Sequence, residues 1–161
     1  MLLTIGSIAP DFELQDQNGN KVKLSSFKGQ KVVIYFYPKD MTSGCTLEAC
    51  EFSLMYDRIK RRALLFGISK DSADSHKKFI AKNKLTFPLL VDAKVCTNAN
   101  GRPCTVAEKY GAWGEKQMYG KVYDGIIRKT FIIDEQGKIM KIFPKVNPLG
   151  HAKEVLEAVL M

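Results

Sequence analysis

Two cysteines five residues apart, Cys45 and Cys50, are the side chains of this chain best suited to do chemistry. They lie in the segment YFYPKDMTSGCTLEAC (residues 35–50), where a strand-like run passes through Pro38 into a turn with Thr42 and then into a helical pattern. A cysteine in the first turn of a helix faces unpaired backbone N–H groups and the positive end of the helix dipole, which favour thiolate over thiol. The thiolate is the nucleophile, so we interpret Cys45 as a reactive thiol.

The neighbours of Cys45 fit an attack on a peroxide. Such an attack needs a thiolate, a cationic or N–H-rich pocket for the oxygen charge that develops, and a way to regenerate the thiol. Thr42 can offer its hydroxyl to the thiolate or to substrate, and Pro38 removes a backbone donor and shields the sulfur from water. A nearby guanidinium would polarise the O–O bond, but these local patterns do not select one among the 25 lysines and arginines.

The spacing of the two cysteines predicts a conformational step. In a regular helix a five-residue separation places the two Cα atoms about 8 to 9 Å apart, whereas a disulfide needs them within about 7 Å. Cys50 therefore cannot bond to Cys45 while the helix is intact. If Cys45 is oxidised to sulfenic acid, we expect the first helical turn to unwind, eased by Gly44, before Cys50 condenses with it.

Strands and helices alternate along the chain. Four short runs rich in β-branched and aromatic residues predict buried strands at 32–37, 64–68, 89–91 and 130–133. Apolar residues at helical spacing predict helices at 49–59, 71–82 and 152–160. The pattern predicts an α/β domain with a mixed sheet.

Turn signals add two hairpins to this core. Asn18 and Gly19 separate two short runs near the N-terminus, and residues 135–137 separate the run at 130–133 from an alternating segment. No internal repeat, low-complexity tract or linker is visible, so we expect residues 1–161 to form a single domain. The Asn, Gly and Pro residues of the segment 96–105 predict an exposed irregular loop.

Composition narrows the class of protein. The chain carries a net charge of +8, but its lysines and arginines occur in ones and twos, with residues 60–62 the longest basic run, so we favour a solvated surface over a nucleic-acid site. No stretch resembles a secretory leader or a membrane span, and we expect a cytoplasmic protein without a membrane partner. Four cysteines in such a chain point to redox chemistry or a metal.

The segment around Cys45 resembles a known family. Pro38, Thr42 and Cys45 match the P-x-x-x-T-x-x-C signature of peroxiredoxins, and YPKDMTSGCTLEAC is similar to the bacterioferritin-comigratory, or peroxiredoxin Q, subfamily. The resemblance covers nearly the whole chain. Its further motifs are Gly6, Ala9, Pro10 and Phe12; Ser69, Asp71, Ser75, His76 and Phe79; Tyr110, Gly111 and Trp113 to Glu115; and Gly125 through Arg128 to Asp134.

This resemblance implies a thioredoxin-like fold, a central mixed β-sheet flanked by helices with an N-terminal β-hairpin. It also implies a thiol peroxidase acting on hydrogen peroxide and organic hydroperoxides, monomeric, without metal or prosthetic group, and re-reduced by thioredoxin. Cys45 would be the peroxidatic residue and Cys50 the resolving residue. Arg128 would supply the guanidinium that surrounds the peroxide with Thr42 and Pro38, and Glu48 would orient Arg128.

The chain departs from the family at two places. Met41 and Ser43 replace the residues usually found beside the signature threonine, which alters no reactive group. The segment 96–105 resembles an insertion and carries Cys96 and Cys104, for which the family offers no role. These two cysteines could form a disulfide, ligate a metal or remain free; we favour free or reversibly oxidised thiols, because no further His or Cys is spaced to complete a zinc site.

Two other functions remain open at this point. One is a protein dithiol-disulfide oxidoreductase, against which the lack of a Cys-x-x-Cys motif argues. The other is a non-enzymatic metal-binding or redox-sensing module that uses all four cysteines. His76 and His151 show no nucleophile-base arrangement, so we expect packing or helix-start roles for them, and we expect Trp113 in the core sooner than at a pocket rim.

Overall fold

The computed structural model describes residues 2–94, 96–97 and 100–161, with the backbone alone for residues 96, 97 and 118. Strands in this part of the chain are β1 (Glu13–Asp16), β2 (Lys21–Lys23), β3 (Lys31–Phe36), β4 (Ala63–Ser69), β5 (Leu89–Val91), β6 (Cys96–Thr97), β7 (Pro103–Cys104), β8 (Trp113–Met118), β9 (Lys121–Ile126), β10 (Lys129–Ile133) and β11 (Ile139–Phe143). Helices are η1 (Leu24–Phe27, a 3₁₀ turn), α1 (Ser43–Ile59), α2 (Ala73–Asn83), α3 (Val106–Lys109) and α4 (His151–Val159).

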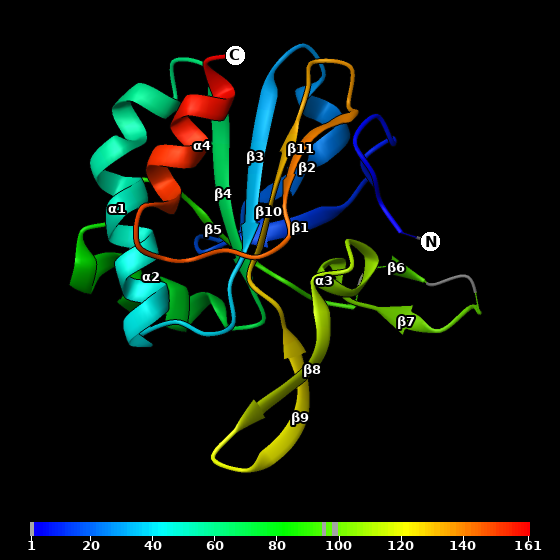
Figure 1. Ribbon diagram of the computed structural model, residues 1–161, viewed down its shortest axis with the longest axis vertical. Helices are drawn as coiled ribbons and strands as arrows, with labels where there is room; N and C mark the ends of the chain where they lie inside the picture. Colours follow the sequence, from blue (N-terminus) through cyan, green and yellow to red (C-terminus); the bar gives the residue numbers. More distant parts are fainter. Residues whose placement is uncertain (1, 95, 98–99) are drawn as a thin grey trace.

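The main sheet of the described chain is mixed, as the sequence predicts. Its seven strands lie in the order β11-β10-β3-β4-β5-β1-β2. β3, β4 and β5 are parallel and are joined by α1 and α2, whereas β10 and β1 pair antiparallel with β3 and β5. Parallel neighbours need such helical crossovers, and the two crossover helices cover one face of the sheet (Figure 1).

The central strand β3 divides the protein interior into two cores. Val33 and Tyr35 pack with α1, α2 and α4 on one face, and Ile34 and Phe36 pack with α3 and the N-terminal segment on the other. All four side chains are at most 1% exposed, which explains why the strand is apolar from Val32 to Phe36 instead of alternating. Both predicted hairpins are confirmed, since β1 pairs with β2 and β10 with β11.

A third hairpin, β8–β9, was not predicted from the sequence. It extends from the body of the molecule in Figure 1, and its tip holds Tyr119 and Gly120, both at positive φ. The four residues from Lys121 to Asp124 are exposed, so the hairpin lacks the buried apolar run on which the strand predictions depended. Trp113, at its base, is partly buried against the core, as expected.

The expectation of an exposed irregular loop at 96–105 was wrong for its C-terminal part. β6 and β7 pair antiparallel, Cys104 is 2% exposed, and Thr105 caps α3 through a capping box with Glu108. The cause is a long-range contact, because the buried carboxylate of Asp92 accepts hydrogen bonds from the first two N–H groups of α3. This contact draws the end of the segment onto the sheet. The thiol of Cys96 lies outside the described side chains.

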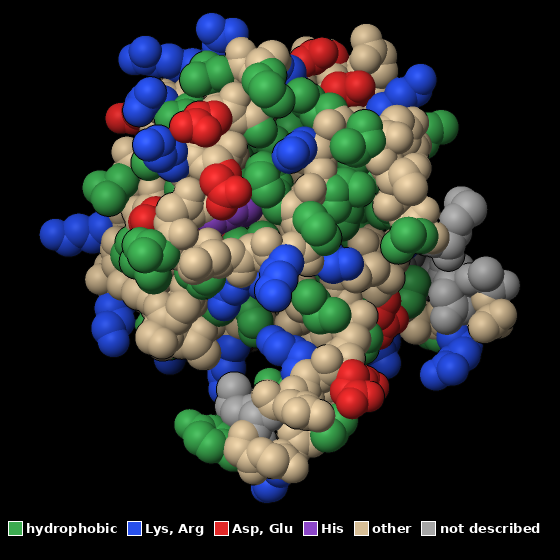
Figure 2. All heavy atoms as spheres, viewed as in Figure 1, with side chains coloured by type: hydrophobic (Ala, Val, Ile, Leu, Met, Phe, Trp, Pro, Cys, Tyr) green, Lys and Arg blue, Asp and Glu red, His purple; other side chains and the backbone are tan. Residues whose placement is uncertain are grey.

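Charge is dispersed on the face of the molecule that Figure 2 shows. Lys and Arg side chains are spread over this face among acidic, apolar and neutral ones. In the described residues no helix combines the length and apolar character that crossing a bilayer requires.

The register of the β6–β7 pair generates a prediction about the two cysteines of the inserted segment. Cys96 and Cys104 are Cα partners, and facing positions of an antiparallel pair lie about 4.5 to 5.5 Å apart, within the reach of a disulfide. In a Cys45→Ser, Cys50→Ser variant, we expect hydrogen peroxide to link these thiols with release of water. Mass spectrometry after alkylation should then find both cysteines unlabelled. Additional Cys104→Ser substitution is the control, and two labelled cysteines after oxidation would contradict the prediction.

Candidate active site

Cys45 lies in the first turn of α1, immediately after the turn that follows β3. Thr42 is the N-cap, in extended conformation, and its carbonyl accepts the first helical hydrogen bond from Thr46 N–H at 2.9 Å. Cys45 is thus the third residue of the helix, where backbone N–H groups have no helical partner. The residue is only 2% exposed, so in this conformation the thiol is closed to the surface of a folded protein.

Arg128 brings a cation to this sulfur. It lies between β9 and β10, and its Nη2 donates to Cys45 Sγ at 3.2 Å while its Nη1 donates to Glu48 Oε1 at 2.7 Å. Glu48 is one helical turn after Cys45, so both side chains face the same guanidinium. The structure therefore brings together the three predicted residues that carry or stabilise charge.

Burial governs the electrostatics of Cys45, Glu48 and Arg128. Glu48 is fully buried and, in the described structure, its Oε2 has no hydrogen-bond partner. Burial raises the pKa of Glu48 to about 7, although the facing Arg128 opposes the shift. Burial by itself would lower the pKa of Arg128, yet the charges of Glu48 and Cys45 raise it above its usual value. The guanidinium thus remains a cation that can stabilise negative charge on the sulfur.

Gly44 makes room for this arrangement. A Cβ atom at residue 44 would lie 3.3 Å from Arg128 Nη2 and 3.6 Å from Pro148 Cγ. A side chain there would press on the guanidinium, so glycine allows Arg128 its approach to the sulfur. The sequence analysis assigned Gly44 only to helix opening, and the structure adds this packing role.

Thr42 and Pro38 lie on the turn that leads to Cys45. Thr42 is exposed, and its hydroxyl donates to the carbonyl oxygen of Lys39 at 2.9 Å. This bond ties the turn together and leaves the lone pairs of the hydroxyl oxygen available. Pro38 is half-buried and lies in the chain between the end of β3 and Lys39. Their predicted contacts with substrate stay predictions.

Cys50 lies in the same continuous helix as Cys45, and the two thiols are not joined. Cys50 is half-buried, and its Sγ is 3.9 Å from Asn83 Oδ1 at the end of α2. The helix is wound from Ser43 to Ile59, so the predicted unwinding is not seen in this state. Among the described residues, no group of three or more His, Cys, Asp or Glu side chains is placed to hold a metal ion.

Two features of the site were missed in the sequence. Lys116 of β8 donates to the carbonyl oxygen of Ile126 at 2.9 Å, and its charge lies near Arg128 and Cys45; burial, and then Arg128, lower its pKa. The motif match at Trp113 to Glu115 adjoins Lys116 and could have indicated it. His76 is a member of a buried hydrogen-bond network with Asp40, 36 residues away, and no local signal indicates that contact.

Comparison with known proteins agrees with the fold and the site. The family model described as AhpC/TSA family matches residues 5–142. Peroxiredoxin Bcp of Bacillus subtilis is 42% identical over 158 residues, covering 98% of this chain and 95% of the relative. Peroxiredoxin Bcp of Escherichia coli K12 is 42% identical over 155 residues, covering 96% of this chain and 94% of the relative.

The solved structure of the Xanthomonas campestris bacterioferritin comigratory protein, described as having alkyl peroxide reduction activity, superposes with a TM-score of 0.83 at 33% identity. The match covers 98% of this chain and 96% of that one. The chain therefore belongs to the AhpC/TSA family and is a peroxiredoxin, an enzyme that reduces peroxides through cysteine thiols.

Proposed function

We propose that Cys45 is the peroxidatic residue and Cys50 the resolving residue of a peroxidase acting on hydrogen peroxide and organic hydroperoxides. A dithiol protein of the thioredoxin type returns both cysteines to thiols. The observation that carries the proposal is the guanidinium of Arg128, shared between Cys45 Sγ at 3.2 Å and Glu48 Oε1 at 2.7 Å. This contact favours a thiolate at the place where a peroxide must bind.

In the first step the Cys45 thiolate attacks the terminal oxygen of the hydroperoxide. The S–O bond forms as the O–O bond breaks; the sulfur becomes sulfenic acid, and the departing oxygen takes a proton and leaves as water or alcohol. Negative charge moves from sulfur to oxygen during this step. The Nη2 group of Arg128 and the N–H groups of the first turn of α1 face that charge, with Thr42 and Pro38 on the turn beside it.

In the second step Cys50 attacks the Cys45 sulfenic acid, the S–S bond forms and water leaves. The wound helix keeps the Cα atoms about 8 to 9 Å apart, so the first turn of α1 must open before this attack. The half-buried Cys50 lies in the second turn, and it becomes reachable as the residues before it move. No atom outside these two side chains takes part in the bond change.

In the third step an external dithiol reduces the disulfide by two thiol–disulfide exchanges. A cysteine residue that is 2% exposed does not admit a folded protein, which favours a small first substrate over a protein disulfide. Opening of α1 exposes the bond to the reductant.

We place the reaction in the cytoplasm, where such dithiols are kept reduced, and in a monomer, because one chain supplies every residue of the site. The dispersed charge favours no nucleic-acid or membrane partner.

The division of roles between the two cysteines predicts different losses. Cys45→Ser should abolish peroxide consumption, because it removes the attacking sulfur. Cys50→Ser should consume one equivalent of peroxide per chain and then stop, because the sulfenic acid cannot form the disulfide that thioredoxin reduces. Single-turnover peroxide consumption and thioredoxin-coupled NADPH oxidation measure the two steps. Equal loss of the first turnover in both variants would refute this assignment.

The raised pKa of Glu48 predicts a pH dependence. Above pH 7 the carboxyl is ionised and fixes Arg128, whereas below pH 7 it is protonated and neutral. Glu48→Gln resembles the protonated form at every pH. The ratio of wild-type to Glu48→Gln rate constants for peroxide should rise from near one at low pH to about ten above pH 8, since a charge-assisted hydrogen bond contributes about 1.5 kcal/mol.

Stopped-flow measurement of the peroxide reaction of both proteins from about pH 5.5 to pH 8.5 gives this ratio, in which any pH dependence common to the two proteins cancels. Glu157→Gln is the matched control, because Glu157 is an exposed residue of α4. A ratio that does not change with pH would show that Glu48 does not control Arg128.

A further inference from the structure

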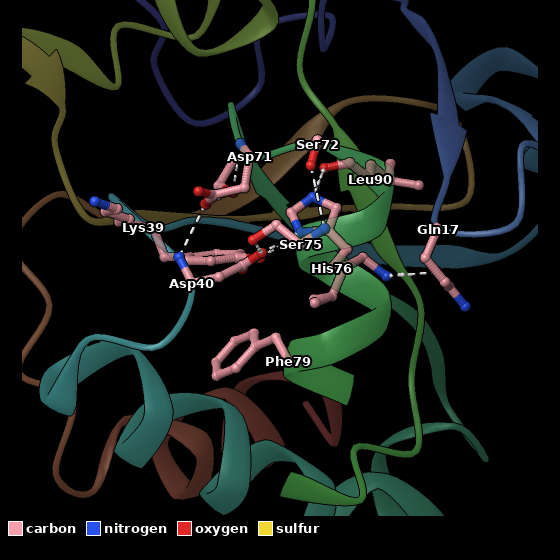
Figure 3. Close-up of polar contacts among 12 residues, drawn as sticks. Gln17, Lys39, Asp40, Asp71, Ser72, Ser75, His76, Phe79 and Leu90 are labelled. Atoms are coloured by element: carbon pink, nitrogen blue, oxygen red, sulfur yellow. Dashed lines mark hydrogen bonds and ion pairs between the residues drawn. The ribbon is translucent and has the colours of Figure 1, made fainter. Parts of the chain in front are cut away.

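A buried network holds the turn that precedes the reactive helix (Figure 3). Its centre is the carboxylate of Asp40, two residues before Thr42. Asp40 Oδ1 accepts from Tyr37 Oη at 2.6 Å, and Oδ2 accepts from Ser75 Oγ at 2.9 Å and lies 2.7 Å from His76 Nδ1. Ser75 and His76 belong to α2, so the network ties the turn to a neighbouring helix.

His76 has a polar partner at each ring nitrogen. Its Nε2 is 2.9 Å from the carbonyl oxygen of Leu90, which can only accept a hydrogen bond. Its Nδ1 faces a carboxylate that already accepts two hydroxyl protons. The side chains of His76 and Asp40 are 0% and 1% exposed, so their contact is fully buried. Loss of a buried hydrogen bond leaves a polar group without a partner, which is costly, so the contact holds Asp40 in place.

The backbone is strained directly after Asp40, whose buried contacts we call the anchor of the turn. Met41, between Asp40 and Thr42, has φ +68°, a left-handed conformation that disfavours side chains with a Cβ atom. The backbone N–H of Asp40 also donates to Asp71 Oδ2 at 2.9 Å. Strain of this kind persists only where surrounding contacts hold it, and release of Asp40 would let the turn relax.

We propose that Asp40, held by Tyr37, Ser75 and His76, is a positioning residue that sets how readily the first turn of α1 opens. It does not touch the sulfur, but it fixes the backbone two residues before the N-cap. The proposal rests on the proposed function, because opening is the step that lets Cys50 reach Cys45. The network thereby controls how long a Cys45 sulfenic acid stays in the pocket.

The time that the Cys45 sulfenic acid spends in the closed pocket decides which of two products forms. A retained sulfenic acid can react with a second hydroperoxide, which transfers one oxygen to sulfur and leaves as water or alcohol, and the product is sulfinic acid. An opened helix instead gives the Cys45–Cys50 disulfide and water. A weaker anchor therefore favours the disulfide, and a stronger one favours overoxidation at a given peroxide concentration.

The first test measures opening without any chemistry at sulfur. Tyr37→Phe removes one hydroxyl donor from Asp40, and Tyr110→Phe is the matched control, since its hydroxyl donates to the carbonyl oxygen of Pro10 at 2.6 Å in the other core. In the reduced protein, hydrogen exchange at Thr46 N–H should be about tenfold faster in Tyr37→Phe, the effect of one charge-assisted hydrogen bond, and unchanged in Tyr110→Phe. Equal exchange in both variants overturns the proposal.

The second test measures the partition of products. After one turnover at a series of hydrogen peroxide concentrations, mass spectrometry gives the ratio of Cys45 sulfinic acid to Cys45–Cys50 disulfide. This ratio should fall about tenfold in Tyr37→Phe and stay at the wild-type value in Tyr110→Phe. Ser75→Ala, which removes another donor from the same carboxylate, should act as Tyr37→Phe does and serves if that variant does not fold.

The two tests separate the proposals. Faster exchange at Thr46 without any Cys45–Cys50 disulfide in the wild type overturns the proposed division of cysteine roles and leaves the anchor supported. A wild type that forms this disulfide, with a product ratio that Tyr37→Phe and Ser75→Ala leave unchanged, overturns the anchor alone.

Discussion

A single guanidinium shared between a sulfur and a buried carboxylate is the contact on which this site depends. Such a pair is costly to desolvate and is favourable only if its geometry is fixed. The sheet provides that geometry, because β10 lies beside β3 with Lys129 opposite Phe36. Arg128, one residue earlier, is therefore held next to the point where β3 ends and the turn to α1 begins. The order of the strands decides which arginine reaches Cys45.

The same helix must satisfy two opposed demands. Its first turn has to be wound to bring Cys45 to Arg128, and it has to unwind to bring Cys45 to Cys50. The rest of α1 is well attached: Phe52 is fully buried, and Glu51 accepts a hydrogen bond from the N–H of Gly150 just before α4. We therefore expect opening to be confined to the N-terminal turn, where the helix can unwind without loss of the core.

Local features of this site could be predicted from the sequence, and distant ones could not. The position of Cys45 at the start of a helix, after a turn with Thr42, follows from neighbouring residues, and the structure agrees with it. Arg128 lies 83 residues from Cys45 and was identified only through the resemblance to a family. The buried contact of Asp40 with His76 joins residues 36 positions apart, and no periodic pattern in the sequence indicates it. The prediction of an exposed loop at 96–105 was wrong at its C-terminal end. It was based on the local Asn, Gly and Pro residues, whereas the tertiary contact of Asp92 with α3 cannot be read from the local sequence.

The positions of Cys45 and Glu48, which both contact Arg128, bear on how the helix can open. Cys45 is in the first turn of α1, whereas Glu48 is in the second. On unwinding of the first turn we expect Cys45 to leave Arg128 and Glu48 to stay beside it, so that the guanidinium keeps its carboxylate and no buried charge loses its partner. The opening step then carries no cost of separating buried charges. What remains are the helical hydrogen bonds of one turn and the contacts of Asp40, and this is why an anchor outside the helix can govern a step inside it.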